Sequence, residues 1–113
     1  MPVEPKVFAV YIMSNWKRGV LYVGVTSNLE NRARQHREGE LEGFSKTYQL
    51  KRLVWYRFYD DAHEAIRFEK QPKRWRRAWK FRLVEEMNPE WDDLWLSLIG
   101  WKDLGPLSHL QGR

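Results

Sequence analysis

Five side chains spread along the sequence have the chemistry that breaking a phosphodiester bond requires: Tyr11, Tyr22, Arg32, His36 and Glu69. An arginine can hold a phosphate through two hydrogen bonds and stabilise its developing charge. A histidine or a tyrosine can manage the proton of an attacking water. A single carboxylate is enough to hold one Mg²⁺ ion, which keeps most of its waters and completes its shell with phosphate oxygens. Each residue alone has a structural explanation, so it is their conjunction that indicates a phosphodiesterase site.

Two of these residues interrupt the apolar face of a predicted helix. The capping-box pattern that starts at Ser27 predicts a helix over residues 28–38. Arg32 and His36 continue the stripe of its two apolar residues, at the spacing of a single helix face. Burying an unpaired cation costs several kcal/mol or more. This face therefore either borders a cleft that binds an anion or lets both side chains reach the rim of the core. Glu69 continues an apolar stripe in the same way on a later helix.

These residues must be positioned by a small set of strands and helices. Strands are predicted over residues 7–13, 20–25 and 51–59, and a loop is predicted over 39–49. The first helix is predicted over 28–38 and the second from 60 or 61 to Pro72. Two further helices are predicted from 72 to 87 and from 89 to about 99. The short loop that ends at Gly19 predicts a hairpin of the first two strands. The order β-β-α-β-α-α-α predicts an α+β fold, with a sheet flanked by helices.

Apolar residues occupy both faces of the third predicted strand. Its alternation places Leu53, Trp55 and Tyr59 on one face and Val54, Tyr56 and Phe58 on the other. We therefore expect a central strand that is covered on both sides.

The helices after this strand are predicted from their apolar spacing. The third helix should turn Trp75, Ala78, Trp79, Leu83 and Met87 inward. This regular spacing favours a core role for the tryptophans over a surface for stacking bases. Asn88 is expected to cap the last helix, which should bury Trp91, Leu94, Trp95 and Leu98 and end at Gly100.

The overall composition limits the class of protein. A chain of 113 residues suits one domain, predicted over residues 7–99, with a disordered lead-in over 1–6 and a tail over 100–113. No apolar run is long enough to span a membrane, and no secretory signal is evident. The absence of cysteine excludes disulfides, thiolate catalysis and cysteine-based zinc sites. We expect a cytoplasmic protein without an obligate protein partner.

The net charge of +5 points to a polyanionic partner. Positive charge is concentrated between residues 70 and 82, where seven lysines and arginines occur without an acid. Six of them should form one outer helix face: Lys70, Lys73, Arg74, Arg76, Arg77 and Lys80. This basic face supports an alternative function, a nucleic-acid-binding module without catalysis. A third, weaker alternative is a protein-interaction domain that uses surplus tryptophans.

Several motifs together resemble the GIY-YIG nuclease superfamily. Val-Tyr-Ile at residues 10–12 and Leu-Tyr-Val-Gly at 21–24 are similar to the two halves of its signature, and residues 28–36 resemble its arginine helix. Residues 64–71 are similar to the region that carries its metal-binding glutamate. Residues 43–46, 75–80 and 87–91 have close counterparts in small single-domain bacterial members that are regarded as endonucleases. The resemblance covers residues 7–99.

The resemblance implies a three-stranded antiparallel sheet and metal-dependent cleavage of DNA, with RNA left open as a substrate. By analogy, Tyr11 activates water with help from His36, Tyr22 orients groups in the site, and Arg32 holds the scissile phosphate. Glu69 would hold Mg²⁺ or Mn²⁺. Asn88 is a further candidate site residue, although its expected capping role explains it equally well.

The chain also departs from the family pattern. Ala9 replaces the first glycine of the signature, Asn31 stands where some members have lysine, and Pro72 stands where leucine is expected. Pro72 bears on the angle between the second and third helices. No separate DNA-binding module is evident, so we expect low sequence specificity. This leaves open a substrate defined by DNA structure, as met in repair or recombination.

Overall fold

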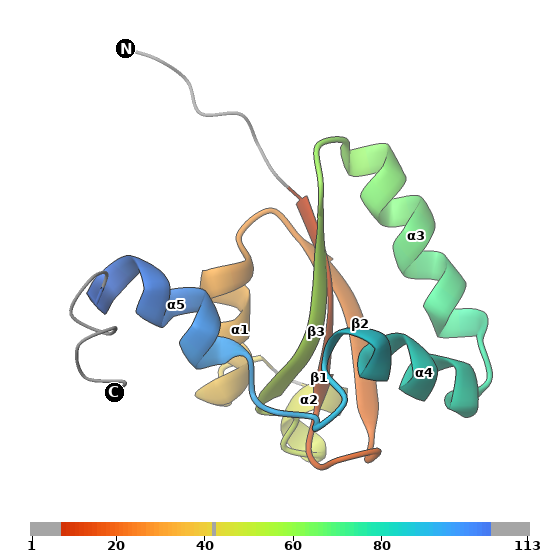
Figure 1. Cartoon of the computed structure of the whole chain (residues 1–113), viewed down its shortest axis with the longest axis horizontal. Coiled ribbons are helices and arrows are strands. Elements are labelled where there is room, and N and C mark those ends of the chain that lie inside the picture. The colour runs from red at the N-terminus through yellow and green to blue at the C-terminus, as the bar shows by residue number, and fades with distance from the viewer. Residues whose placement is uncertain (1–7, 42, 105–113) are drawn as a thin grey trace.

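A three-stranded antiparallel sheet separates two layers of helices in the computed structural model, which describes residues 8–41 and 43–104 (Figure 1). The elements in chain order are β1 Phe8–Ser14, β2 Leu21–Thr26, α1 Leu29–Arg37, α2 Phe44–Thr47, β3 Arg52–Tyr59, α3 Ala62–Arg74, α4 Arg77–Met87 and α5 Trp95–Leu104. The predicted α+β class is confirmed, and the sheet has the predicted three antiparallel strands. The observed order, β-β-α-α-β-α-α-α, adds one short helix to the predicted order.

The first strand is the centre of the sheet. The strand order is β2-β1-β3, and β1 pairs antiparallel with both neighbours. Residues 9–14 are almost completely buried, as the continuous apolar run of β1 predicts. The predicted hairpin of β1 and β2 is confirmed. The expectation that β3 is central is wrong, because the central position belongs to β1.

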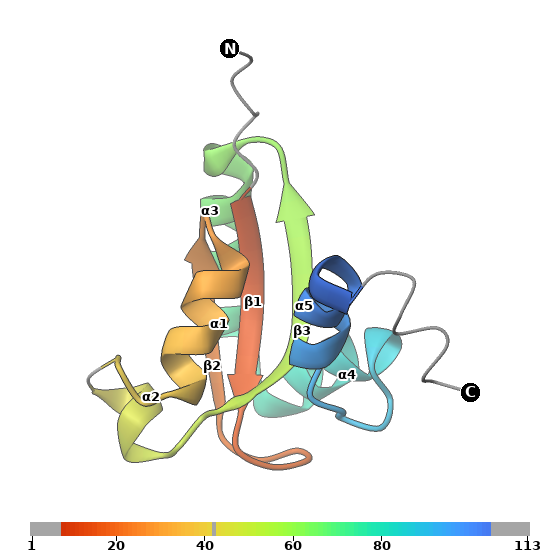
Figure 2. The ribbon, with the colours of Figure 1, turned by 90° about the vertical axis from the view of Figure 1, so that its left-hand side faces the viewer.

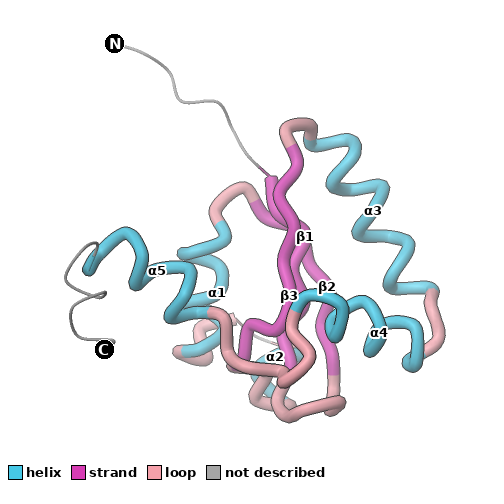
Figure 3. Tube along the Cα trace, viewed as in Figure 1, coloured by secondary structure: helices cyan, strands magenta, loops and turns pink. Residues whose placement is uncertain are grey.

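Each face of the sheet covers its own half of the hydrophobic core. The α3-side core contains Val10, Ile12, Val23, Val54, Trp55, Ala65, Val84 and Trp91. The α1-side core contains Ala9, Tyr11, Met13, Leu29, Ala33, Leu50 and Leu53, with residues of α5 packed against it. Figures 1 and 3 show α3 and α4 on one side of the strands and α1 and α5 on the other, and Figure 2 looks onto the α1 side.

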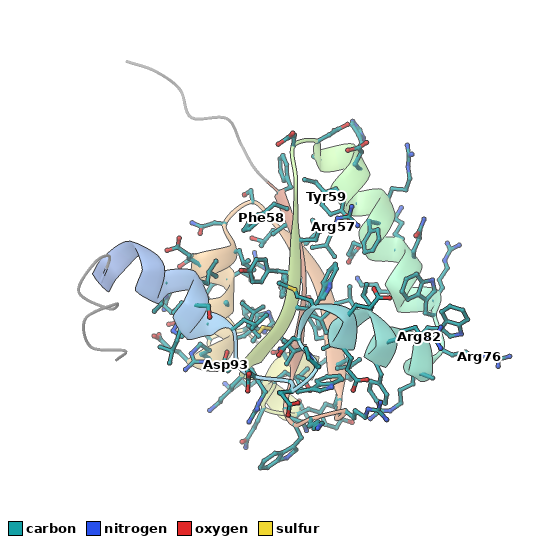
Figure 4. All side chains as sticks on the ribbon, in the orientation of Figure 1. Arg57, Phe58, Tyr59, Arg76, Arg82 and Asp93 are labelled. Carbon is teal, nitrogen blue, oxygen red and sulfur yellow. The ribbon has the colours of Figure 1, made fainter. Side chains whose placement is uncertain are left out.

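A β-bulge in β3 changes which residues face each core. Trp55 lies opposite Ile12, but Leu53 lies opposite Met13, so Val54 is an extra residue in β3. Val54 and Trp55 therefore both join the α3-side core, and Leu53 joins the α1-side core. The predicted alternation is wrong at Leu53 and Val54, because a bulge is not visible in a period-two pattern. Beyond the bulge, Phe58 and Tyr59 point to opposite sides of the sheet, as Figure 4 shows.

The chain after α4 returns to the outer edge of β3. The backbone N–H of Leu94 donates to the carbonyl of Leu53 at 2.7 Å, and the Leu53 N–H donates to the Asp93 carboxylate at 3.1 Å. Asp93 also pairs with Arg37 of α1, and it lies beside β3 in Figure 4. These contacts attach the last helix to both the sheet and α1.

The first helix begins one residue later than predicted. Asn28 is its N-cap, and the Asn28 side chain accepts a hydrogen bond from the N–H of Asn31 at 3.1 Å. The Ser27–Glu30 capping box is therefore wrong in detail, since the neighbouring asparagine takes the capping role. Within the region predicted as a loop, residues 44–47 form α2.

The second and third predicted helices are divided differently. The helix α3 continues through Pro72 to Arg74, and α4 begins only at Arg77. Pro72 lies in the last turn of α3, so the missing N–H removes only one helical hydrogen bond.

The predicted inward face of α4 is wrong for three residues. Ala78, Trp79 and Met87 are exposed, whereas Val84 is buried and Phe81 packs against the α3-side core. Apolar residues occur on more than one side of this helix, so its periodicity does not select the buried face.

The segment between α4 and α5 is a braced turn and not a helix. Asn88 follows the end of α4, and its side-chain amide donates to the carbonyls of Val54 at 3.0 Å and Asp92 at 2.8 Å, while its oxygen accepts from the Asp92 N–H at 3.0 Å. Trp91 is fully buried, as predicted, but it adopts φ +59° within this turn. The last helix starts at Trp95 and continues past Gly100, contrary to the predicted boundaries.

Two expectations lie outside the described residues, namely disorder over residues 1–6 and the tail beyond residue 104. Among the helices of the described part of the chain, none is long and apolar enough to cross a lipid bilayer.

We predict that Asn88→Ala lowers the free energy of unfolding by about 2–4 kcal/mol, because it leaves buried backbone groups of the turn without partners. Urea denaturation monitored by circular dichroism measures this change. Asn31→Ala is the matched control, since the Asn31 amide is exposed and contacts Arg34 on the surface, and it should change stability by no more than about 0.5 kcal/mol. Equal effects of the two substitutions would show that Asn88 does not brace the turn.

Candidate active site

Tyr11 lies at the centre of the α1 side of the sheet and is fully buried. Its ring lies across Gly24, the residue opposite it on β2. A Cβ atom placed on Gly24 would stand only 2.6 Å from the Tyr11 ring and hydroxyl. The close approach therefore requires glycine at this position of β2.

A chain of two hydrogen bonds links Tyr11 to both neighbouring helices. The Tyr11 hydroxyl lies 3.0 Å from Nε2 of His36 in α1, and Nδ1 of the same ring lies 2.5 Å from Oγ of Ser45 in α2. All three side chains are buried. A phenol is a stronger donor than a serine hydroxyl, so we assign Tyr11 as the donor to Nε2 and the Nδ1–H of His36 as the donor to Ser45.

Burial and the charge of Arg32 set the protonation states of Tyr11 and His36. Burial raises the pKa of the Tyr11 phenol well above its usual value, the neighbouring Tyr22 adds to the rise, and the positive charge of Arg32 partly offsets it. Burial also lowers the pKa of His36 to about 4, with a further lowering from Arg32. At neutral pH both groups are therefore uncharged, with the Nε2 lone pair free to accept a proton from Tyr11.

Tyr22 completes the group from the edge strand β2. The centroid of its ring lies 6.1 Å from that of Tyr11 and 5.3 Å from that of His36. Tyr22 and Arg32 are half-buried, whereas Tyr11 and His36 are buried beneath them. The more exposed pair thus forms the side of the group that a substrate can reach. We call these residues the tyrosine–histidine cluster: Tyr11, Tyr22, Arg32, His36 and Ser45.

Glu69 lies on the other face of the sheet. It belongs to α3, and its helix neighbours Ala65 and Phe68 pack in the α3-side core. Phe68 stacks on Trp55 of β3, and successive helix residues are rotated by about 100°. Glu69 is therefore directed away from Trp55, on a helix that also contacts β1 and β2. Its side chain is buried and pairs with Lys73 one turn later. The structure thus brings together four of the five predicted chemical residues and places Glu69 across the sheet from them.

The residues present fit a divalent ion held by a single carboxylate. Within residues 8–41 and 43–104, no group of three or more histidine, cysteine or carboxylate side chains could form a protein cage for a metal. Mg²⁺ does not need such a cage, because it keeps several waters and often takes only one or two carboxylates. Glu69 offers one carboxylate of this kind.

The predicted basic face is only partly free for a ligand. Lys73 pairs with Glu69, and Arg77 donates to the backbone carbonyls of Arg18 and Gly19 at 2.9 and 2.8 Å. Lys80 is half-buried. Arg76 extends away from the sheet in Figure 4. Along α3, a shallow basic groove of about 500 Å³ is lined by His63, Ile66, Arg67, Lys70, Gln71 and Arg74.

The structure gives Asn88 a bracing role away from the cluster and adds Ser45 to the cluster. Asn88, predicted as a further site residue, uses its amide to brace the turn after α4, on the Val54 side of the sheet. Ser45, which we did not select from the sequence, touches His36 directly. Its residue type carried no signal, although it lies in the Gly-Phe-Ser-Lys segment that resembles the small bacterial members.

A sequence model described as the GIY-YIG catalytic domain matches residues 7–82, which is more than half of the chain. The chain belongs to the GIY-YIG family. The match includes both strand tyrosines, the arginine helix and α3 with Glu69. The matched region contains all five residues of the tyrosine–histidine cluster, and a GIY-YIG catalytic domain suggests a nuclease.

Relatives of this GIY-YIG chain occur among bacterial proteins named UPF0213. A protein of this name from Staphylococcus haemolyticus is 34% identical over 77 residues, which cover 68% of this chain and 93% of the relative. Another from Aeromonas salmonicida is 30% identical over 83 residues, which cover 72% of this chain but only 61% of the relative. These names state no activity. No solved structure gives a significant match to the chain.

We predict that His36 makes the protein less stable in mild acid. Its pKa is about 4 in the folded state, against the ordinary histidine value of 6.5 that applies to the unfolded chain, so the unfolded chain binds more protons between these two pH values. The free energy of unfolding should therefore be constant above about pH 6.5 and fall as the pH drops toward 4, by on the order of 2 kcal/mol.

Urea denaturation at several pH values compares the wild type with His36→Gln and His63→Gln. The His36 variant should lose most of this pH dependence. His63 is exposed and provides the matched control, so its variant should follow the wild type. A wild-type curve that stays flat between pH 6.5 and 4 would contradict the assigned neutral state of His36.

Proposed function

We propose that this protein is a divalent-metal-dependent endonuclease that hydrolyses DNA phosphodiester bonds. The observation that carries the proposal is the buried hydrogen-bonded chain from Tyr11 through His36 to Ser45, with Arg32 beside it. These hydrogen bonds provide a route for a proton, and Arg32 provides a site for a phosphate. The family match supports the nuclease class.

The proposed proton transfer runs along the chain of hydrogen bonds. A water that attacks the phosphorus gives a proton to the Tyr11 oxygen, while Tyr11 passes its own proton to Nε2 of His36. Tyr11 stays neutral throughout, which agrees with its raised pKa. Ser45 holds the Nδ1–H of His36, so that Nε2 remains the accepting nitrogen. Tyr22 limits where the water can lie, since its ring packs beside both partners.

Binding of the substrate makes His36 a better base. Burial is the larger cause of the lowered His36 pKa, and the positive charge of Arg32 lowers it further. A scissile phosphate that pairs with Arg32 compensates this charge and raises the pKa of His36 again. The part of the lowering that comes from Arg32 is therefore relieved when a phosphate is in place. Arg32 also stabilises the extra negative charge that develops on the phosphate oxygens.

Glu69 is the residue that we propose to hold Mg²⁺ or Mn²⁺. When bound there, such an ion would supply positive charge to the phosphate oxygens and to the leaving group. Glu69 belongs to α3, which contacts β2, and β2 is an edge strand whose other face carries Tyr22. We propose that the substrate backbone passes this edge, where it can approach both residues.

The DNA backbone outside the site is proposed to contact the basic groove on α3. Its lysine and arginines are exposed and contribute binding energy that does not depend on base sequence. Low sequence specificity follows from this mode of binding. The same groove supports the alternative function, a nucleic-acid-binding module without catalysis.

We predict that the protein nicks supercoiled or branched DNA in the presence of Mg²⁺ or Mn²⁺, and that Arg32→Ala lowers the cleavage rate by roughly a hundredfold to a thousandfold. Glu69→Gln should lower it at least as strongly, because it removes the charge that holds the ion. Conversion of supercoiled to open-circular plasmid on agarose gels measures the rate.

Each substitution has a control on its own helix. Arg34→Ala is matched to Arg32→Ala, since the Arg34 guanidinium pairs with Glu38 and Glu40 on the surface. Glu64→Gln is matched to Glu69→Gln, because Glu64 is exposed on α3. Both controls should retain nearly full activity. Cleavage that survives both Arg32→Ala and Glu69→Gln would overturn the endonuclease proposal, and salt-dependent binding without cleavage would favour the alternative.

We predict a positioning role for Ser45. The substitution Ser45→Ala should lower kcat by up to about a hundredfold with little change in KM, because His36 then loses its fixed orientation and tautomer. Ser45→Thr keeps the hydroxyl and should restore most of the rate. An equal loss in both variants, or a change confined to KM, would argue against this role.

A further inference from the structure

An exposed aromatic pair lies next to the tyrosine–histidine cluster. Phe44 and Tyr48 stand one turn apart at the two ends of α2, and their ring centroids are 4.8 Å apart with 49° between the ring planes. The exposed fractions are 49% for Phe44 and 47% for Tyr48. Large apolar side chains that stay half in water need a reason, because their burial would be favourable.

The backbone fixes this pair in place. Gly43 before α2 has φ +93°, and Gln49 after it has φ +54°, so sharp changes of direction bound the short helix at both ends. The N–H of Leu50 donates to the carbonyl of Ser45 at 2.9 Å, and the Leu50 side chain is fully buried in the α1-side core. The aromatic pair is thus held on a rigid support rather than on a free loop.

The helix that carries the pair also contacts the catalytic histidine. Ser45 lies between the two aromatic residues in the sequence, is buried, and bonds to His36 at 2.5 Å. Ser45 therefore faces the proposed site of phosphate cleavage, while the two aromatic rings on the same short helix are exposed to solvent. Figure 2 shows α2 at the end of α1.

The segment that carries the pair is itself basic. Residues 43–51 include two lysines and no acid. On the preceding turn, Glu38 and Glu40 both pair with Arg34, whose single positive charge compensates one of the two carboxylates. A ligand that offers negative charge together with a flat, aromatic face would match this surface.

We propose that Phe44 and Tyr48 form a stacking platform for an unpaired nucleobase next to the scissile phosphate. This inference rests on the proposed function for the position of the phosphate. Aromatic side chains bind the faces of bases with little dependence on sequence. Bases inside a duplex have their faces covered by neighbouring pairs, so the platform selects single-stranded or displaced nucleotides. The enzyme therefore favours DNA with unpaired bases at the cleavage point over an intact duplex.

A nucleobase fits this surface better than a protein partner does. The apolar area comprises two rings within a polar segment that contains lysine, threonine and glutamine, whereas a stable protein interface buries about 800 Å² on each partner around an apolar centre. A base needs only one ring face and a neighbouring positive charge.

The test measures binding without metal, so that cleavage does not interfere. The probe is a single strand of about 12 nucleotides that contains one 2-aminopurine, a fluorescent base that is quenched by stacking, and the same strand in a duplex. The wild type should bind the single strand more tightly and quench its fluorescence. The double substitution of Phe44→Ala with Tyr48→Ala should weaken binding by roughly tenfold or more and abolish the quenching.

Two further variants separate stacking from other effects. Replacing both residues by leucine keeps apolar volume but removes the aromatic faces, and it should also abolish quenching. Trp79→Ala removes an aromatic side chain that is 55% exposed on α4, across the sheet, and should leave binding and quenching unchanged. Circular dichroism confirms that each variant is folded.

The outcomes distinguish this inference from the proposed function. Wild-type binding by both double variants, or an equal loss in Trp79→Ala, overturns the platform, even where plasmid cleavage proceeds normally. Failure to bind either oligonucleotide also overturns it. Quenching that depends on the aromatic pair supports the platform, and it does so even where the protein with Mg²⁺ cleaves no DNA.

Discussion

The buried hydroxyl of Tyr11 is the constraint around which the α1 side of the molecule is arranged. A phenol on the most buried strand of the sheet cannot reach water, and leaving it unbonded would cost on the order of 1–3 kcal/mol. His36 provides its partner, which fixes how α1 lies on the sheet. Ser45 then satisfies the second nitrogen of the ring and fixes α2. Gly24 is required because the phenol ring occupies the space of a side chain. One polar group thus determines two helices and one strand position.

The two faces of the sheet have different roles in this arrangement. On the α1 side, polar groups are buried and hydrogen-bonded to one another, and their protonation depends on the charge of Arg32. On the α3 side, packing is mainly aromatic and aliphatic, and polar groups such as Asn88 brace the backbone. Glu69 is a charged residue within this apolar layer, and it stays tolerable because Lys73 compensates its charge. Both helical layers flank the edge strand β2, where we propose that one substrate approaches them.

Sequence patterns predicted the sheet, and the proximity of Tyr11, Tyr22, Arg32 and His36, better than they predicted the helix boundaries. The apolar run of β1 has one explanation, burial on both faces, and that expectation held. Arg32 and His36 were recognisable because ionisable residues on an apolar stripe need a partner. The bulge at Val54 and the exposure of Trp79 were not recognisable, since both depend on tertiary contacts that no local pattern encodes. Ser45 was missed for the same reason, because nothing in a single serine shows that a histidine lies 2.5 Å away.

The hydrogen bonds between β3 and the chain after α4 affect whether a strand of another molecule can add to this edge of the sheet. An edge strand normally presents free N–H and C=O groups, to which a strand of another molecule can add. At Leu53 both groups are already used, the carbonyl by Leu94 and the N–H by Asp93. The adjacent bulge at Val54 further disturbs the flat pairing that an added strand would need. The protein thereby protects one edge of a small sheet against edge-to-edge aggregation, by means of its own later segment.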